Sequence, residues 1–156
     1  MSLITLHFSI DIRAPKDKVW RTMFADNSYR EWTSAFCPGS YFDGSWALGS
    51  KILFLGPDPD PDAKGVVGGM VSRIAENRLH EYMGIEHLGM VSNGVEDTQS
   101  DAVKDWAGAR ENYSFSESMG VTTLRVDTQT APAYESMFND SWPKALQKLK
   151  ALSESA

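Results

Sequence analysis

The chain has 156 residues, a formal net charge of −6 and a sequence pI of about 5.0. This length suits one domain, residues 1–156, and a content of 42% hydrophobic and 23% charged residues excludes a disordered or fibrous protein. The lysine and arginine residues are dispersed, so no basic stripe is available to neutralise the phosphates of a nucleic acid or an anionic membrane. We therefore expect no nucleic-acid partner.

Cys37 is the single cysteine, which rules out an internal disulfide and favours a reducing compartment. No histidine lies near it in sequence, and we interpret its thiol as a packing group rather than a nucleophile. The opening stretch MSLITLHFSIDI has neither the basic start nor the small-residue cleavage site of a signal peptide. No apolar run is long enough to span a bilayer. We expect a cytoplasmic protein.

The first elements are a strand and two short helices. Isoleucine, leucine and phenylalanine alternate with polar residues over 4–12, which predicts a strand with one buried face. Pro15 suits a helix N-terminus, and apolar residues at helical spacing follow it up to Phe24. A second short helix is predicted over 27–32. The two helices carry Trp20 and Trp32, whose large side chains we expect to cover another part of the protein.

The middle of the chain predicts a run of strands near 41–46, 51–55, 65–74, 79–87, 107–117 and 121–130. The breaks between them are DGSWALGS, GPDPDPDAKG, AEN and SMG, and short connections of this kind indicate an antiparallel meander. PDPDPD resembles a calcium loop only superficially, and we interpret it as a solvated connection. The polar segment 88–105, with a helical turn near 100–106, is long enough to be functional and to flank a cavity.

The end of the chain predicts a long amphipathic helix. Pro132 fits its first turn, whereas Pro143 removes a hydrogen bond inside it. We expect a kink or restart over 139–143, with Asp140 as a new N-cap. The apolar positions at i, i+3 and i+4 spacing are Tyr134, Met137, Phe138, Trp142, Ala145, Leu146, Leu149 and Leu152.

This order of elements resembles the helix-grip fold of START-like proteins, the SRPBCC superfamily. The stretches APKDKVWRTM, YREW, WALGSKILF, GGMVSRIAENRLHEY, ENYSF and SWPKALQKLKAL are similar to the branch named after the activator of the heat-shock chaperone ATPase. The resemblance implies an α+β fold in which a curved antiparallel sheet of about seven strands wraps around the C-terminal helix. It also implies a cavity between the two, with the short helices, Trp20 and Trp32 capping one end.

A bent sheet covered by one helix is either closed by large side chains or keeps a pocket. We expect a ligand to contact both aromatic and polar side chains. The predicted contact residues are Trp32, Trp46, Phe54, Glu81, Tyr82, Met83, Glu111, Tyr113, Phe138 and Trp142.

Two carboxylates, Glu81 and Glu111, fall on the apolar parity of their predicted strands and are the candidate catalytic groups. Burial raises the pKa of a carboxyl group toward the range of general acid–base catalysis. The alternatives are a structural bond of Glu81 or Glu111 to Tyr113, Arg110 or a backbone amide near the rim, and a register in which both side chains face water. The histidines show no metal-ligand spacing, so we expect no metal site.

Three functions remain open. The first is a module that binds a hydrophobic, aromatic or lipid-like small molecule. The second is a cyclase, lyase or hydrolase on the same scaffold. The third, which the resemblance alone implies, is a co-chaperone that binds a chaperone partner. The sequence has no phosphate-binding glycine loop or dinucleotide fingerprint, so no cofactor is expected. Either a monomer or a homodimer fits.

Overall fold

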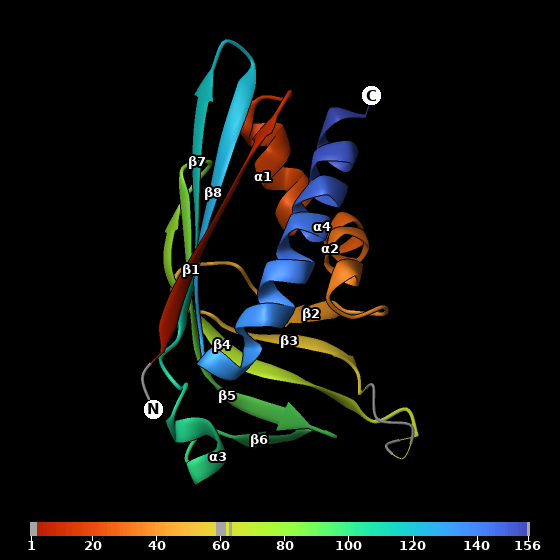
Figure 1. The fold of residues 1–156 in the computed structure, drawn as a ribbon, viewed down its shortest axis with the longest axis vertical. Coiled ribbons are helices and arrows are strands. Elements are labelled where there is room, and N and C mark those ends of the chain that lie inside the picture. The colour runs from red at the N-terminus through yellow and green to blue at the C-terminus, as the bar shows by residue number, and fades with distance from the viewer. Residues whose placement is uncertain (1–2, 59–61, 63, 156) are drawn as a thin grey trace.

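A curved antiparallel sheet with one long helix across it forms the fold (Figure 1), seen in a computed structural model that describes residues 3–58, 62 and 64–155. The strands are β1 Ile4–Ile12, β2 Tyr41–Gly44, β3 Lys51–Pro57, β4 Val67–Arg78, β5 Tyr82–Ser92, β6 Val95–Asp97, β7 Arg110–Ser118 and β8 Val121–Thr130. The helices are α1 Lys16–Phe24, α2 Asp26–Trp32, η1 Thr33–Ala35, α3 Asp101–Lys104, η3 Pro132–Tyr134 and α4 Glu135–Glu154.

The sheet has the strand order β1-β8-β7-β5-β4-β3-β2, with β6 paired to the end of β5. All the ladders of the described residues are antiparallel, and α1, α2 and α4 lie on the same face of the sheet (Figure 1). The predicted α+β helix-grip fold is therefore confirmed. The sheet has one strand more than predicted, because β6 forms within the segment that we expected to be a loop.

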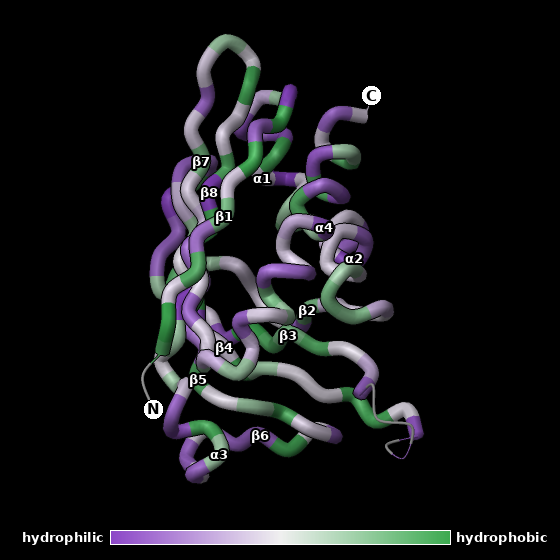
Figure 2. The backbone as a smooth tube through the Cα atoms, in the orientation of Figure 1, coloured by the Kyte–Doolittle hydropathy of each residue, from purple (hydrophilic) through white to green (hydrophobic). Residues whose placement is uncertain are grey.

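β1 and β8 show why this part of the fold can be predicted from the sequence. β1 pairs with β8 along its whole length, from Ile4↔Thr130 to Ile12↔Thr122. Its exposure alternates residue by residue, and Figure 2 shows the same alternation of hydrophobic and hydrophilic residues. Side chains of successive strand residues point to opposite faces, so this alternation buries one face of the strand against the helices.

The curvature that opens space under the helix comes from irregular strands. β4 has register shifts between Val71 and Ser72 and between Ile74 and Glu76, and such bulges bend and twist a strand. Gly69 lies where β4 crosses close to β3, since a Cβ there would be 1.8 Å from the carbonyl oxygen of Phe54. A side chain at this position is therefore excluded by the backbone of the neighbouring strand.

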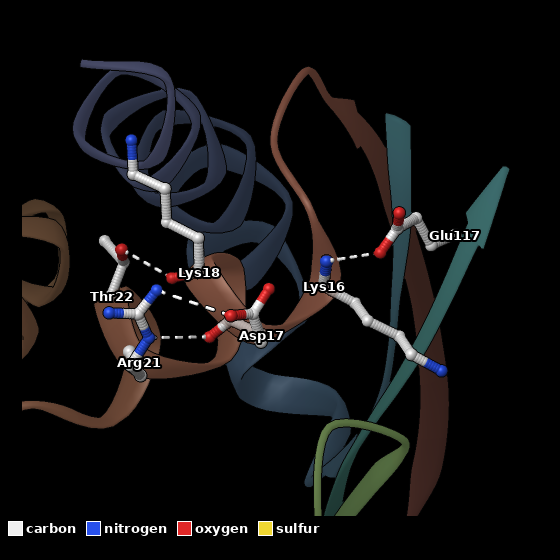
Figure 3. Close-up of polar contacts among 6 residues, drawn as sticks. All are labelled: Lys16, Asp17, Lys18, Arg21, Thr22 and Glu117. Atoms are coloured by element: carbon white, nitrogen blue, oxygen red, sulfur yellow. Dashed lines mark hydrogen bonds and ion pairs between the residues drawn. The ribbon is translucent and has the colours of Figure 1, made fainter. Parts of the chain in front are cut away.

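The first helix is fixed to the sheet at its N-terminus (Figure 3). Pro15, its N-cap, offers no side-chain hydrogen bond, so the first amide groups need another acceptor. The Lys16 amide donates to Glu117 Oε1 of β7 at 2.8 Å. Within the helix, the Thr22 hydroxyl donates to the Lys18 carbonyl at 2.8 Å. This anchor holds α1 against the end of the β7–β8 hairpin.

The tryptophans of the two short helices are both buried. Trp20 packs against Phe115 and Phe24, and its ring centroid lies 5.2 Å and 4.9 Å from theirs. Trp32 donates its indole hydrogen to the Met23 carbonyl at 3.0 Å, and its ring lies 6.2 Å from that of Trp142 on α4. Trp20 thus closes one end of the fold, while Trp32 joins α2 to the long helix.

Helix α4 runs without interruption from Glu135 to Glu154, so the restart predicted over 139–143 is wrong. Pro143 lies inside the helix, next to Trp142, which is 3% exposed. The packing of Trp142, Leu146 and Leu149 into the core compensates for the hydrogen bond that proline removes. None of the described helices is long and apolar enough to cross a membrane.

Several predicted strand boundaries are wrong, and those of β5 differ most. β5 begins at Tyr82 rather than at 79, because residues 79–81 form the turn after β4, with His80 in the left-handed region at φ 63°. β5 then continues to Ser92 and pairs with β6, so the segment 88–105 is partly strand. Its predicted helical turn is present as α3. Half of the PDPDPD connection, residues 59–61, lies outside the described residues.

Candidate functional site

A hollow of about 480 Å³ lies between the sheet and the helices α2 and α4. A second hollow of about 340 Å³ adjoins it toward α3 and the start of η3. The two share part of their walls, and we call them the inner and the outer compartment. The shared residues are Met70, Met90, Glu111, Met137 and Phe138.

Aromatic rings make up much of the wall of the inner compartment. They come from both short helices, from the strands, from α4 and from the connections that carry Phe36 and Trp46: Phe24, Tyr29, Trp32, Phe36, Trp46, Phe54, Tyr113, Phe138 and Trp142. Many neighbouring rings meet edge to face or tilted, as between Trp46 and Phe54 at 5.7 Å and Phe36 and Trp142 at 4.9 Å. Such packing gives a rigid apolar surface, which suits a planar or bulky apolar molecule.

Four polar side chains form a connected cluster at the junction of the compartments. His87 of β5 contacts Ser72 of β4 through Nδ1 at 2.7 Å and Glu111 of β7 through Nε2 at 3.0 Å. The Tyr113 hydroxyl donates to the other oxygen of Glu111. His87 and Ser72 are buried, whereas the Glu111 side chain keeps 20% of its area exposed and lines both compartments.

One arrangement of protons satisfies every contact in this cluster. With its proton on Nε2, His87 donates to Glu111, while Nδ1 accepts the proton of the Ser72 hydroxyl. Tyr113 then donates to Glu111 as well. The His87 and Tyr113 hydrogens point toward the carboxylate and the Ser72 hydrogen points toward His87, so the cluster offers the hollow only acceptor capacity on Glu111. A carboxylate has about four lone-pair sites, of which His87 and Tyr113 occupy two.

Tyr29 of α2 lines the inner compartment together with Glu111. Burial, together with the negative charge of Glu111, raises the pKa of the Tyr29 phenol well above its ordinary value. Tyr29 therefore stays neutral at any physiological pH. The indole Nε1 of Trp46 is buried without a hydrogen-bond partner among the described residues.

Most of the predicted contact residues meet in the inner compartment: Trp32, Trp46, Phe54, Glu111, Tyr113, Phe138 and Trp142 all line it. Tyr82 does not, because its parity places it on the outer face, where Arg78 covers its ring at 5.0 Å. Met83 faces inward but is fully buried in the core below the hollow. Neither residue lines a compartment.

Glu81 is the clearest error in the predicted site. It is exposed in the turn before β5 and pairs with Lys16 of α1. The hydrogen bond from Lys16 and the charge of that ammonium lower the pKa of Glu81, so it is an ordinary ionised surface carboxylate. The prediction that it faces inward is wrong because the strand starts one residue after it. Glu111 does face inward, bonded to Tyr113, which was one of the alternatives.

Sequence reasoning missed three features of the site. Ser72 is buried beside Val71 because the bulge between them breaks the alternation of β4. His87 has the inward parity, but its pairing with Glu111 depends on the register of β5 and β7, which places Ile85 opposite Glu111. The methionines at the shared wall carry no sequence signal. No cluster of potential metal ligands is present in the part of the chain that the structure describes.

Comparisons with known proteins identify the fold but no family. No family model matches the chain, and no curated protein sequence is similar to it. A protein from Nitrosomonas europaea superposes with a TM-score of 0.71 at 12% identity, over 96% of this chain and 93% of that one. The solution structure of the Aha1 dimer from Colwellia psychrerythraea gives 0.66 at 17% identity, over 97% of each chain. CalU16 from Micromonospora echinospora gives 0.65 at 15%, over 96% and 76%. These likenesses establish the fold.

Proposed function

We propose that the protein binds an apolar or aromatic small molecule in the inner compartment, between the sheet and α4, as a START-like protein of the SRPBCC superfamily. The observation that carries this proposal is a hollow of about 480 Å³ with aromatic walls and one convergent polar cluster. Small-molecule sites are typically concave, mostly apolar and of 300 to 1,000 Å³, with a few polar groups that fix orientation. The burial of Ser72 and His87 gives this cluster a fixed geometry.

A filling substitution tests the proposal. Val91 lines the inner compartment and is 4% exposed, whereas Val95 of β6 is exposed and lines neither compartment. Val91→Trp places an indole in the hollow, and Val95→Trp makes the same chemical change on the surface. The probe is 2-(1-naphthyl)ethanol, which is apolar, planar and uncharged. Isothermal titration calorimetry measures its affinity for each protein.

We expect a dissociation constant of about 10 to 100 µM for the unmodified protein and for Val95→Trp, within the affinity that so small a ligand can reach. Val91→Trp is expected to bind at least about tenfold more weakly, because the indole takes the volume that the probe needs. Circular dichroism confirms that each variant is folded. Equal binding by both tryptophan variants contradicts the proposal, as does the absence of binding to the unmodified protein.

The contact between His87 and Glu111 favours an enzyme as the second candidate. A carboxylate held by two donors and partly exposed to a hollow can abstract a proton from a bound molecule. Glu111→Gln separates the two functions, because a binding site keeps its shape with glutamine whereas a general base loses its chemistry. In an enzyme, this variant binds substrate but forms no product. In a binding module, the unmodified protein forms no product either.

A further inference from the structure

The charges around the two compartments are of one sign. The carboxylates among the described lining residues are Glu111 and Asp58, the histidine is His87, and no lysine or arginine lines either compartment. The whole chain carries a net charge of −6. A carboxylate or phosphate on a ligand would therefore meet repulsion, and no basic partner is present among these lining residues to neutralise it.

The hydrogen bonds within the cluster also favour a ligand group that donates a hydrogen bond. With the His87 proton on Nε2, Ser72 donates to His87, and His87 and Tyr113 donate to Glu111, so both ring nitrogens of the histidine are occupied. What remains open to the hollow is acceptor capacity on the carboxylate, whose side chain is 20% exposed. A ligand group placed there must donate a hydrogen bond. An acceptor group, such as a ketone or an ether, would face another acceptor.

The aromatic rings near Glu111 are a third feature that favours a cationic ligand. Phe54 lies 6.0 Å from the ring of His87, Phe138 lines both compartments as Glu111 does, and Tyr113 bonds directly to the carboxylate. Aromatic faces attract a cation through their quadrupole, most strongly where water is excluded. Burial is the main cause of the raised pKa of Tyr29, and the negative charge of Glu111 acts in the same direction.

Resting on the proposed function, we infer that the natural ligand is an organic cation: an apolar, ring-bearing molecule with a protonated amine that donates to Glu111 at the junction of the compartments. The carboxylate supplies a charge-assisted hydrogen bond, the rings supply cation–π contacts, and the inner compartment takes the apolar body. Fatty acids and other anionic lipids are excluded by the same charges.

Three probes with the same naphthalene body and different polar ends test this inference. They are 2-(1-naphthyl)ethylamine, 2-(1-naphthyl)ethanol and 1-naphthylacetate, which are cationic, neutral and anionic at pH 7. Calorimetry on the unmodified protein is expected to show the amine binding about tenfold tighter than the alcohol, the effect of one charge-assisted bond in a partly desolvated site. The acetate is expected to bind weakest.

Glu111→Gln removes the charge while keeping the shape of the side chain. The amine is then expected to bind no tighter than the alcohol, while the affinity for the alcohol changes by less than about threefold. Glu86→Gln is the matched control, since Glu86 lies on the outer face of β5 and pairs with Arg73 at 2.7 Å. It makes the same change in net charge, and the preference for the amine is expected to persist.

The outcomes separate the two proposals. If the unmodified protein binds the alcohol as tightly as the amine, or the acetate most tightly, the inference about charge is overturned and the binding function stands. If the preference persists in Glu111→Gln, Glu111 is not the recognising group and the inference is overturned as well. If the folded, unmodified protein binds none of the three probes, both proposals fail. If the Glu111→Gln variant does not fold, the order of the three probe affinities in the unmodified protein still tests the inference about charge.

Discussion

Replacing Trp142 of α4 by alanine tests how the long helix is held against the sheet. The indole is 3% exposed, and its ring lies 4.9 Å from Phe36, 5.9 Å from Phe8 and 6.1 Å from Tyr113. Removing a buried tryptophan typically lowers the free energy of unfolding by about 3 to 5 kcal/mol. One side of this ring borders the hollow, so truncation enlarges an existing space, and we expect about 3 kcal/mol.

The assay is guanidinium unfolding followed by far-ultraviolet circular dichroism, with Lys144→Ala as the control. Lys144 is exposed on the same helix, and its loss is expected to change the free energy of unfolding by at most about 0.5 kcal/mol. In a thermal scan, about 3 kcal/mol corresponds to a Tm lower by about 6 to 12 °C for a chain of this size. A change in Trp142→Ala no larger than that of the control would refute the packing of α4 described above.

Three further predictions follow from particular positions. Gly69→Ala is expected to lower the free energy of unfolding by more than about 2 kcal/mol, because its Cβ would lie 1.8 Å from the Phe54 carbonyl oxygen, and an unchanged denaturant midpoint would contradict that approach. The pKa of Tyr29 is raised in the folded state, so Tyr29 ionises first in the unfolded chain and stability falls as the pH rises above about 10. The Tyr29→Phe variant lacks this group and is expected to lose less stability between about pH 10 and 12. Unfolding midpoints measured across this pH range test the prediction. Hydrogen exchange is expected to be fast at Gly94 and Thr98, which are exposed in the turns on either side of β6, and slow at Met83 and Ile85, which are buried in β5, whereas equal protection would contradict this packing.

The parts of the fold that were predictable from the sequence depend on local patterns. The alternation of β1 and the helical spacing of Trp142, Leu146 and Leu149 give both the element and its buried face. The start of β5 was not predictable in this way. Leu79 looks like a strand residue but is 66% exposed, in a turn that places His80 in a left-handed conformation, which is rare for residues other than glycine.

The candidate site was also predictable from the sequence only in part. Strand parity was sufficient to place Glu111 and Tyr113 on the inner face, and the aromatic composition was sufficient to predict a ring-lined wall. The cluster around His87 depends on how β4, β5 and β7 are aligned with one another, and on the bulge that turns Ser72 inward. Register and bulges are set by tertiary packing, so a single sequence does not reveal that these side chains meet.

The most direct test of the binding site is an amide NMR titration of the isotopically labelled protein with 2-(1-naphthyl)ethanol. Binding in the inner compartment is expected to shift the amide signals of Ile85, Glu111, Tyr113 and Phe138, whose side chains line it, and to saturate with a single dissociation constant. The signal of Met119, which is 99% exposed at the tip of the β7–β8 hairpin, is expected to stay unchanged. Shifts scattered over the surface, or none at millimolar probe, would contradict the central claim that the hollow between sheet and helix binds a small molecule.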